Sequence, residues 1–257
     1  MNVTSRLAEI KQPGRYIKTS QFKVTSFDDG IILNEEENIA PAVAGLAVDY
    51  LTRFIKSKNK EDSFRISLLG AHVAEKYMGV KNSKSVAQEL LNNINGIDDF
   101  SIFSACKLVT FDVWFRNTNV ALRVKDYTYT NPDKKTIYNI RVLVNRCISF
   151  LDKFGDSIIY GFRFNGGYTP TVNSGDGDYL SEDTLWDFKV SKNNPRTRDA
   201  LQVLMYWIMG KHSGQEIFKN ITKIGIYNPR LNNQFVIDMN TFSKEIIKAV
   251  EKDVICY

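Results

Sequence analysis

The first half of the chain places its hydrophobic residues at the three- and four-residue spacing of amphipathic helices. One run begins at Pro41, a residue tolerated in a first helical turn, and is expected to end near Ser57. Residues 1–36 lack this spacing and predict an irregular or partly extended arm. The pattern predicts a mainly helical region over residues 1–135, with three further helices over residues 62–78, 84–94 and 100–115. A strand over residues 107–115 is the alternative for the end of the last helix.

The pattern changes after a polar, turn-rich stretch over residues 117–135, which favours a loop or linker. A helix is predicted from Thr136 to Phe154, and shorter alternating runs follow Gly155. We expect strands at 157–164, 176–180, 184–190, 221–227 and 235–239, and helices from Pro195 and over 241–250. This order predicts an α+β fold in which a mixed central sheet flanked by helices, over residues 136–257, follows the helical region, either as a second domain or as part of one continuous domain.

The two strands at 176–180 and 184–190 are joined by a polar turn and read as a hairpin. A tight turn centred on Glu182 and Asp183 would put Asp178 opposite Asp187 and Asp176 opposite Lys189. Because side chains alternate between the faces of a strand, these four residues would share one face. Their neighbours Trp186, Phe188 and Val190 would point the other way, toward a core.

Three carboxylates around one ammonium suggest a cation site, because close like charges cost free energy that a divalent cation offsets. Magnesium binds oxygen ligands at about 2.0–2.1 Å and keeps waters that serve as nucleophiles. Lys189 would then lie near that water or near a scissile phosphate. The alternative is a solvated hairpin with an exposed ion pair, which is common on protein surfaces.

Composition and charge are those of an ordinary globular protein, with 43% hydrophobic and 25% charged residues. The net charge of +5 mildly favours polyanionic partners. The three cysteines are scattered without metal-site spacing and fit a reducing compartment. No apolar signal region or membrane-length apolar run is present, so we expect a cytoplasmic protein with no membrane partner.

Three segments together resemble the PD-(D/E)XK nuclease superfamily, in particular its RecB-like branch, which includes CRISPR-associated exonucleases of that kind. The segments are GDGDYL at 175–180, Asp187-Phe188-Lys189, and Gln202 with Tyr206 in LQVLMYW. They agree with the family in order and spacing over roughly residues 155–240. The resemblance implies a restriction-endonuclease-like core and a nuclease that requires Mg²⁺ or Mn²⁺.

The resemblance also implies roles for individual residues. Asp178 and Asp187 would bind the metal, with the Phe188 carbonyl as an extra ligand. Lys189 would assist the attacking water or the phosphate. Gln202 and Tyr206, four residues apart on one helical face, would shape the site or touch nucleic acid.

The chain departs from the family pattern at several positions. Gly177 stands where the signature proline is usual, and Asp176 competes with Asp178 as first ligand, although the register favours Asp178. The family's upstream helical histidine is matched in spacing by Asp49 within Gly45–Asp49, so Asp49 is a candidate ligand. His72 is the other option, but a lone helical histidine is more often a packed or surface residue. The cysteines that bind an iron–sulfur cluster in some CRISPR-associated relatives are absent, so no such cluster is expected.

The loop after the catalytic lysine carries Lys192, Arg196 and Arg198 beside a predicted helix start. Cations and outward-pointing N–H groups at a helix N-terminus suit phosphate contacts. The alternative is a solvated capping region.

The combined expectation is a magnesium-dependent deoxyribonuclease that hydrolyses phosphodiester bonds, in a setting such as phage defence or DNA repair. Two other interpretations remain open. One is a catalytically inactive nuclease fold that binds nucleic acid or a protein partner. The other is a structural protein organised by its helical half, which leaves the carboxylate and lysine face unexplained.

Overall fold

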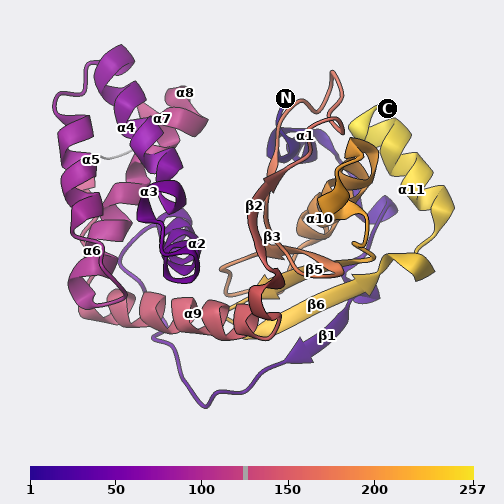
Figure 1. The fold of residues 1–257 in the computed structure, drawn as a ribbon, viewed down its shortest axis with the longest axis horizontal. Coiled ribbons are helices and arrows are strands. Elements are labelled where there is room, and N and C mark those ends of the chain that lie inside the picture. Colours follow the sequence, from indigo (N-terminus) through magenta and orange to yellow (C-terminus); the bar gives the residue numbers. More distant parts are fainter. Residues whose placement is uncertain (124–126) are drawn as a thin grey trace. The chain divides into compact units, whose positions relative to one another are not determined.

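The computed structural model describes residues 1–123 and 127–257, which divide into two compact units. The sheet unit combines Met1–Asp29 with Leu151–Tyr257, and the helical unit is Gly30–Phe150. All described strands belong to the sheet unit (Figure 1). The predicted loop over 117–135 contains two short helices, α8 (Thr118–Ala121) and η4 (Tyr127–Tyr129), and its residues 124–126 lie outside the described part of the chain.

The sheet has six strands in the order β1-β6-β5-β4-β3-β2. All neighbouring pairs are antiparallel except β4 with β5, which are parallel. The expected mixed sheet flanked by helices is therefore confirmed. The strands are β1 (Lys23–Ser26), β2 (Ile159–Arg163), β3 (Asp176–Leu180), β4 (Thr184–Phe188), β5 (Lys223–Asn228) and β6 (Asn233–Asp238).

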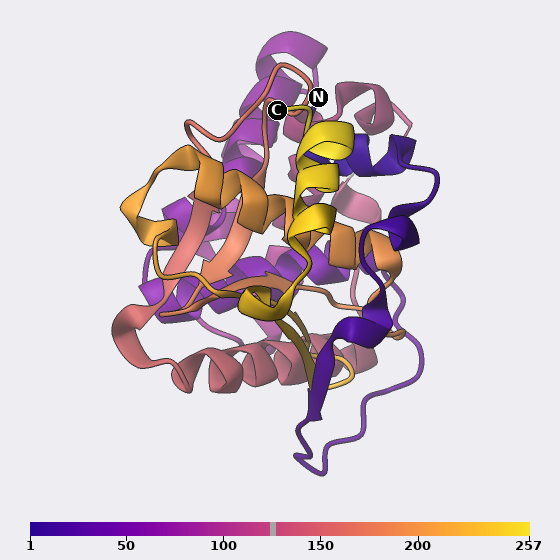
Figure 2. The same cartoon turned by 90° about the vertical axis from the view of Figure 1, so that its right-hand side faces the viewer.

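Helix α10 (Thr197–Ser213) is the crossover that joins parallel strands β4 and β5. A parallel pair requires such a connection, and its helix must cover a face of the sheet. Buried side chains of α10 form one apolar core with β4, β5 and β6 and with α1 (Val3–Glu9) and α11 (Lys244–Val250). Figure 2 shows α10 and the yellow C-terminal helix α11 in front of the sheet. Helix α10, which follows Lys189 in the sequence, therefore packs against β4, the strand that contains Asp187.

The N-terminal arm is more ordered than its sequence suggests. Strand β1 pairs with β6 from Lys23↔Val236 to Ser26↔Asn233, and α1 packs into the sheet core through Val3 and Leu7. The extended part of the expected arm is present as β1, but helix α1 and the pairing of β1 with β6 were not predicted, because a four-residue edge strand has too few positions to show alternation. This pairing also places Met1–Asp29 with the C-terminal strands, so the units differ from a division at residue 135.

The helical unit has helices in all the predicted regions, but two of the predicted helices are interrupted. The helix predicted over 62–78 is divided at Phe64, which leaves the helical conformation and packs edge-on against Tyr50 at 5.5 Å between ring centroids. The helix predicted over 100–115 is divided by the 3-10 turn Val109–Phe111, and the alternative strand over 107–115 is not formed. The helices of the unit are α2 (Pro41–Ser57), α3 (Lys60–Ser63), α4 (Arg65–Met78), α5 (Ser83–Asn92), α6 (Asp99–Leu108), α7 (Asp112–Arg116), α8 (Thr118–Ala121) and α9 (Lys134–Asp152), the last of which ends in the sheet unit.

A buried polar cluster joins three of these helices. Asp112 of α7 accepts hydrogen bonds from the Tyr50 hydroxyl of α2 and the Ser67 hydroxyl of α4, both at 2.5 Å. Arg116 contacts the same carboxylate at 3.3 Å. Burial raises the pKa of Asp112, and these donors partly offset that shift. The cluster fixes the packing of α2, α4 and α7, because each buried polar group has its partner on another helix.

Within the part of the chain that the structure describes, no helix combines the length and apolar character needed to cross a bilayer.

Candidate active site

The hairpin β3–β4 has the register expected from its turn. Tyr179 pairs with Trp186 and Leu180 with Leu185, the alignment that brings Asp178 across from Asp187. Beyond these pairs, the Asp178 carboxylate accepts a hydrogen bond from the backbone N–H of Phe188 at 2.8 Å. The side chain of Asp178 is thereby tied to the end of the strand that carries Asp187.

Both faces of β4 are buried, which excludes the solvated hairpin as an account of this segment. Asp187 is 3% exposed, and Leu185 on the same face belongs to the core shared with α10. On the opposite face, Trp186 is 2% exposed and Phe188 packs on Tyr227 at 5.2 Å. A carboxylate at such a position needs a partner, because burying an unpaired charge is costly.

Lys189 is that partner, and it begins a chain of polar contacts into α10. Its ammonium lies 2.8 Å from Asp187 Oδ2 and donates to Gln202 Oε1 at 3.0 Å. Gln202 in turn donates from Nε2 to the Tyr206 hydroxyl at 2.7 Å. An ammonium can only donate, so the Gln202 oxygen must face Lys189 and its nitrogen must face Tyr206. The structure therefore brings Lys189 of the Asp187-Phe188-Lys189 segment into direct contact with Gln202, and through Gln202 with Tyr206.

The charges of the site act on both ends of this chain. Burial lowers the pKa of the Lys189 ammonium, but the carboxylates of Asp187 and Asp178 more than offset this effect, so its pKa is raised. Burial, followed by the nearby carboxylates of Asp187, Asp178 and Asp176, raises the pKa of Tyr206 well above its ordinary value. Lys189 is thus held as a cation and Tyr206 as a neutral hydroxyl at neutral pH.

The donor set suits a hard divalent cation. Asp178 in the middle of β3 and Asp187 near the end of β4 supply carboxylate oxygens, and Asp176 is an exposed third carboxylate close by. Magnesium is commonly held by one or two carboxylates, with water and substrate phosphate oxygens filling the other positions. Among the described residues, no group of three or more His, Cys, Asp or Glu side chains has the arrangement of a metal cage. The roles of Asp176 and of the Phe188 carbonyl as ligands stay predictions.

The two candidates from the helical region lie in the helical unit. Asp49 is on α2, and its carboxylate pairs with Arg53 one turn later at 2.9 Å. His72 is exposed on α4, with its ring centroid 6.5 Å from that of Tyr77. Asp49 as a metal ligand stays a prediction.

Two of the candidate nucleic-acid contacts, Lys192 and Arg196, lie between β4 and α10, and the third, Arg198, lies in the first turn of α10. The side chains of Lys192, Arg196 and Arg198 all face solvent. Helix α10 starts at Thr197 instead of the expected Pro195, because Asp199 accepts the backbone N–H of Arg196 at 2.7 Å and pairs with its guanidinium at 3.4 Å. Arg196 therefore belongs to the helix cap, as the capping alternative expects, while Lys192 lies in the loop before it.

Two residues that support the site were not identified from the sequence. Asn228, at the end of β5, donates to the backbone of the loop that follows Lys189. Tyr168 donates to the carbonyl of Gly175 at 2.6 Å, directly before β3. The only sequence signal for Asn228 was its position directly after a predicted strand, and Tyr168 had no signal. Both residues act through backbone contacts with segments far away in the sequence, which residue types do not reveal.

Gly177 fits this site because a neighbouring ring fills the space beside it. A Cβ at this position would lie 2.1 Å from the ring of Phe162, which pairs with Gly177 across the β2–β3 ladder. Phe162 is 4% exposed and packs edge-on against Phe164 and Phe218, so its ring has little room to move. Local packing thus explains why a glycine stands at this position.

We predict that Gly177→Ala lowers the free energy of unfolding by about 2 kcal/mol, because overpacking a filled core displaces buried side chains. Urea denaturation followed by circular dichroism measures this change. In a Phe162→Leu background, in which the obstructing side chain is smaller, Gly177→Ala is expected to lower the free energy of unfolding by less. Equal costs of Gly177→Ala in both backgrounds would contradict the explanation.

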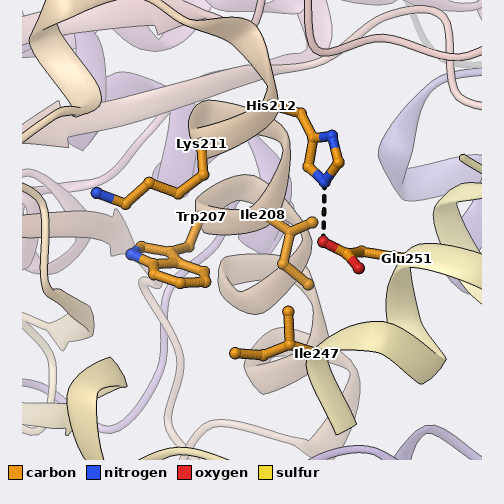
Figure 3. A pocket seen from close by; sticks show the side chains of 6 residues that line it. All are labelled: Trp207, Ile208, Lys211, His212, Ile247 and Glu251. Atoms are coloured by element: carbon orange, nitrogen blue, oxygen red, sulfur yellow. Dashed lines mark hydrogen bonds and ion pairs between the residues drawn. The ribbon is translucent and has the colours of Figure 1, made fainter. Parts of the chain in front are cut away.

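A separate surface pocket of about 250 Å³ lies between α10 and the C-terminal segment (Figure 3). Its polar groups already have partners within the protein: His212 contacts Glu251 at 2.8 Å, and Lys211 donates to the Phe218 carbonyl at 2.8 Å. The pocket is lined by Trp207, Ile208, Lys211, His212, Ile247 and Glu251, none of which belongs to the carboxylate and lysine site.

Comparison of the chain with models of known families, with curated proteins and with solved structures finds no match.

Proposed function

We propose that this chain is a divalent-metal-dependent nuclease that hydrolyses phosphodiester bonds in DNA. The observation that carries the proposal is the position of Lys189, a partly exposed ammonium held between buried Asp187 and Gln202. A lysine fixed by a buried carboxylate and an amide oxygen in this way suits a reaction in which negative charge grows on a phosphate.

The chain's own residues can each contribute to such a reaction. Asp178 and Asp187 would hold the cation, which supplies Lewis-acid activation of water and phosphate. Lys189 has three N–H groups, one of which donates to Gln202, while the ammonium also forms the ion pair with Asp187. We assign a further N–H group to an anionic oxygen of the substrate. Tyr206 accepts its bond from Gln202, so its own hydroxyl proton is directed to another acceptor.

Supporting features lie along the segment that follows the site. Lys192 and Arg198 place exposed cations between β4 and the first turn of α10, where phosphate contacts would orient a nucleic-acid strand. The residue pattern resembling RecB-like nucleases favours DNA as the substrate.

The test is cleavage of single-stranded and double-stranded DNA with Mg²⁺ or Mn²⁺ and with EDTA. We expect metal-dependent cleavage by the wild type and a loss of at least about 10²-fold in kcat for Lys189→Ala, the scale of removing one transition-state donor. Lys223→Ala is the matched control, since Lys223 pairs with Asp183 at the turn end of the same hairpin. Salt-sensitive DNA binding without cleavage would instead support a nuclease fold that only binds.

A further inference from the structure

Asn228 lies at the end of β5 and is completely buried. Its side-chain nitrogen donates to the carbonyls of Ser191 at 2.8 Å and Asn193 at 3.2 Å. Its side-chain oxygen accepts from the backbone N–H groups of Arg230 at 3.0 Å and Leu231 at 3.4 Å. These four contacts match the two donors and two acceptor sites of an asparagine side chain. The amide orientation follows from its partners, which are carbonyls on one side and N–H groups on the other.

The two carbonyls that Asn228 holds belong to the residues directly before and after Lys192. The loop is also restrained internally, because Asn193 N–H donates to the Ser191 hydroxyl at 3.1 Å. The exposed Lys192 side chain is therefore presented from a short backbone segment anchored on both sides to one buried amide. Loops without such anchors leave exposed lysines free to sample many positions, at an entropic cost when they bind.

Lys189 has separate supports. Its backbone N–H donates to the Tyr227 carbonyl at 2.9 Å, and its ammonium is held by Asp187 and Gln202. Loss of the Asn228 anchor would consequently leave the lysine of the site in place and release the loop after it.

We propose that Asn228 is a positioning residue that presents Lys192 to the phosphate backbone of a bound nucleic-acid strand. The inference rests on the proposed function, and it assigns to Asn228 an effect on strand binding instead of on the chemical step. Asn228 acts through Lys192, so removing either residue abolishes the same contact.

The test is a double-mutant cycle on the Kd of a fluorescein-labelled single-stranded oligodeoxynucleotide, measured by anisotropy in EDTA so that no cleavage occurs. We expect Lys192→Ala and Asn228→Asp each to raise Kd about 3- to 10-fold, the scale of one lost polar contact. The double variant is expected to bind no more weakly than whichever single variant has the higher Kd, because the two substitutions remove the same contact. In Mg²⁺, Asn228→Asp is expected to raise KM by a similar factor with kcat within about twofold.

Two further variants serve as controls. Asn232→Asp places the same new charge in the turn that joins β5 to β6 and retains the oxygen that accepts a hydrogen bond from the Tyr227 hydroxyl, so the Kd of this variant is expected to stay within about twofold of wild type. Asn228→Ala removes the anchor without adding charge and is expected to match Asn228→Asp. Hydrogen exchange at residues 191–194 is expected to accelerate in both Asn228 variants and not in Asn232→Asp.

Independent, multiplying effects of Lys192→Ala and Asn228→Asp would overturn the inference, as would unchanged loop exchange or a fall in kcat at constant KM. These failures are distinct from failure of the proposed function. If the wild type binds DNA without cleaving it, the proposed nuclease activity is contradicted, and the double-mutant cycle on Kd still decides the role of Asn228. A wild type that cleaves DNA while Asn228→Asp binds normally overturns the role of Asn228 alone.

Discussion

Replacing Asp187 by asparagine is expected to lower kcat for metal-dependent DNA cleavage by at least about 10²-fold, with little change in secondary structure. Asparagine has nearly the same shape as aspartate, so the buried position stays filled. It removes the charge that holds the Lys189 ammonium at 2.8 Å and that would bind the cation. Burial, which lowers the pKa of Lys189, would then be offset without the carboxylate of Asp187.

The matched control is Asp183→Asn at the turn of the same hairpin. Asp183 also pairs with a lysine, Lys223, but its side chain is 42% exposed and lies at the far end of the strand. We expect the kcat of Asp183→Asn to remain within about twofold of wild type, as for most substitutions of exposed residues. Cleavage assays on the two variants side by side make the comparison. Equal activity of Asp187→Asn and Asp183→Asn would show that the carboxylate beside Lys189 takes no part in the reaction.

The second large effect concerns stability. Asp112→Ala is expected to lower the free energy of unfolding of the helical unit by about 3 kcal/mol, since it leaves two buried hydroxyls without this acceptor. Those hydroxyls belong to Tyr50 and Ser67, which are 3% and 0% exposed. Urea denaturation monitored by circular dichroism at 222 nm measures the change.

Asp99→Ala provides the comparison within the same unit. Asp99 pairs with Arg141, but its side chain is 67% exposed, and exposed ion pairs contribute about 0–1 kcal/mol. A cost for Asp112→Ala as small as that for Asp99→Ala would contradict the role given to the buried cluster.

The hairpin shows how far the sequence reaches when the determining contacts are local. A short polar turn between two alternating runs predicted the pairing of Tyr179 with Trp186, and therefore the proximity of Asp178 and Asp187. The same local logic placed Gln202 and Tyr206 on one face of α10. The chain of contacts from Asp187 to Tyr206 follows from these two placements and from the crossover that lays α10 over the sheet.

Other features depend on segments far apart in the chain and could not be predicted in this way. Strand β1 exists because it pairs with β6, more than 200 residues later in sequence. The burial of both faces of β4 depends on which helices cover the sheet, and the pattern of a single strand does not specify them. Asn228 holds the loop after Lys189 through backbone carbonyls, which leave no trace in residue type.

The measurement that tests the central claim most directly is anomalous diffraction from crystals of this protein soaked in Mn²⁺. The account predicts a manganese peak within bonding distance of carboxylate oxygens of both Asp178 and Asp187, close to the Lys189 ammonium, and loss of that peak in Asp187→Asn. A well-ordered site with no peak at these carboxylates, under conditions in which the same protein cleaves DNA, would contradict it.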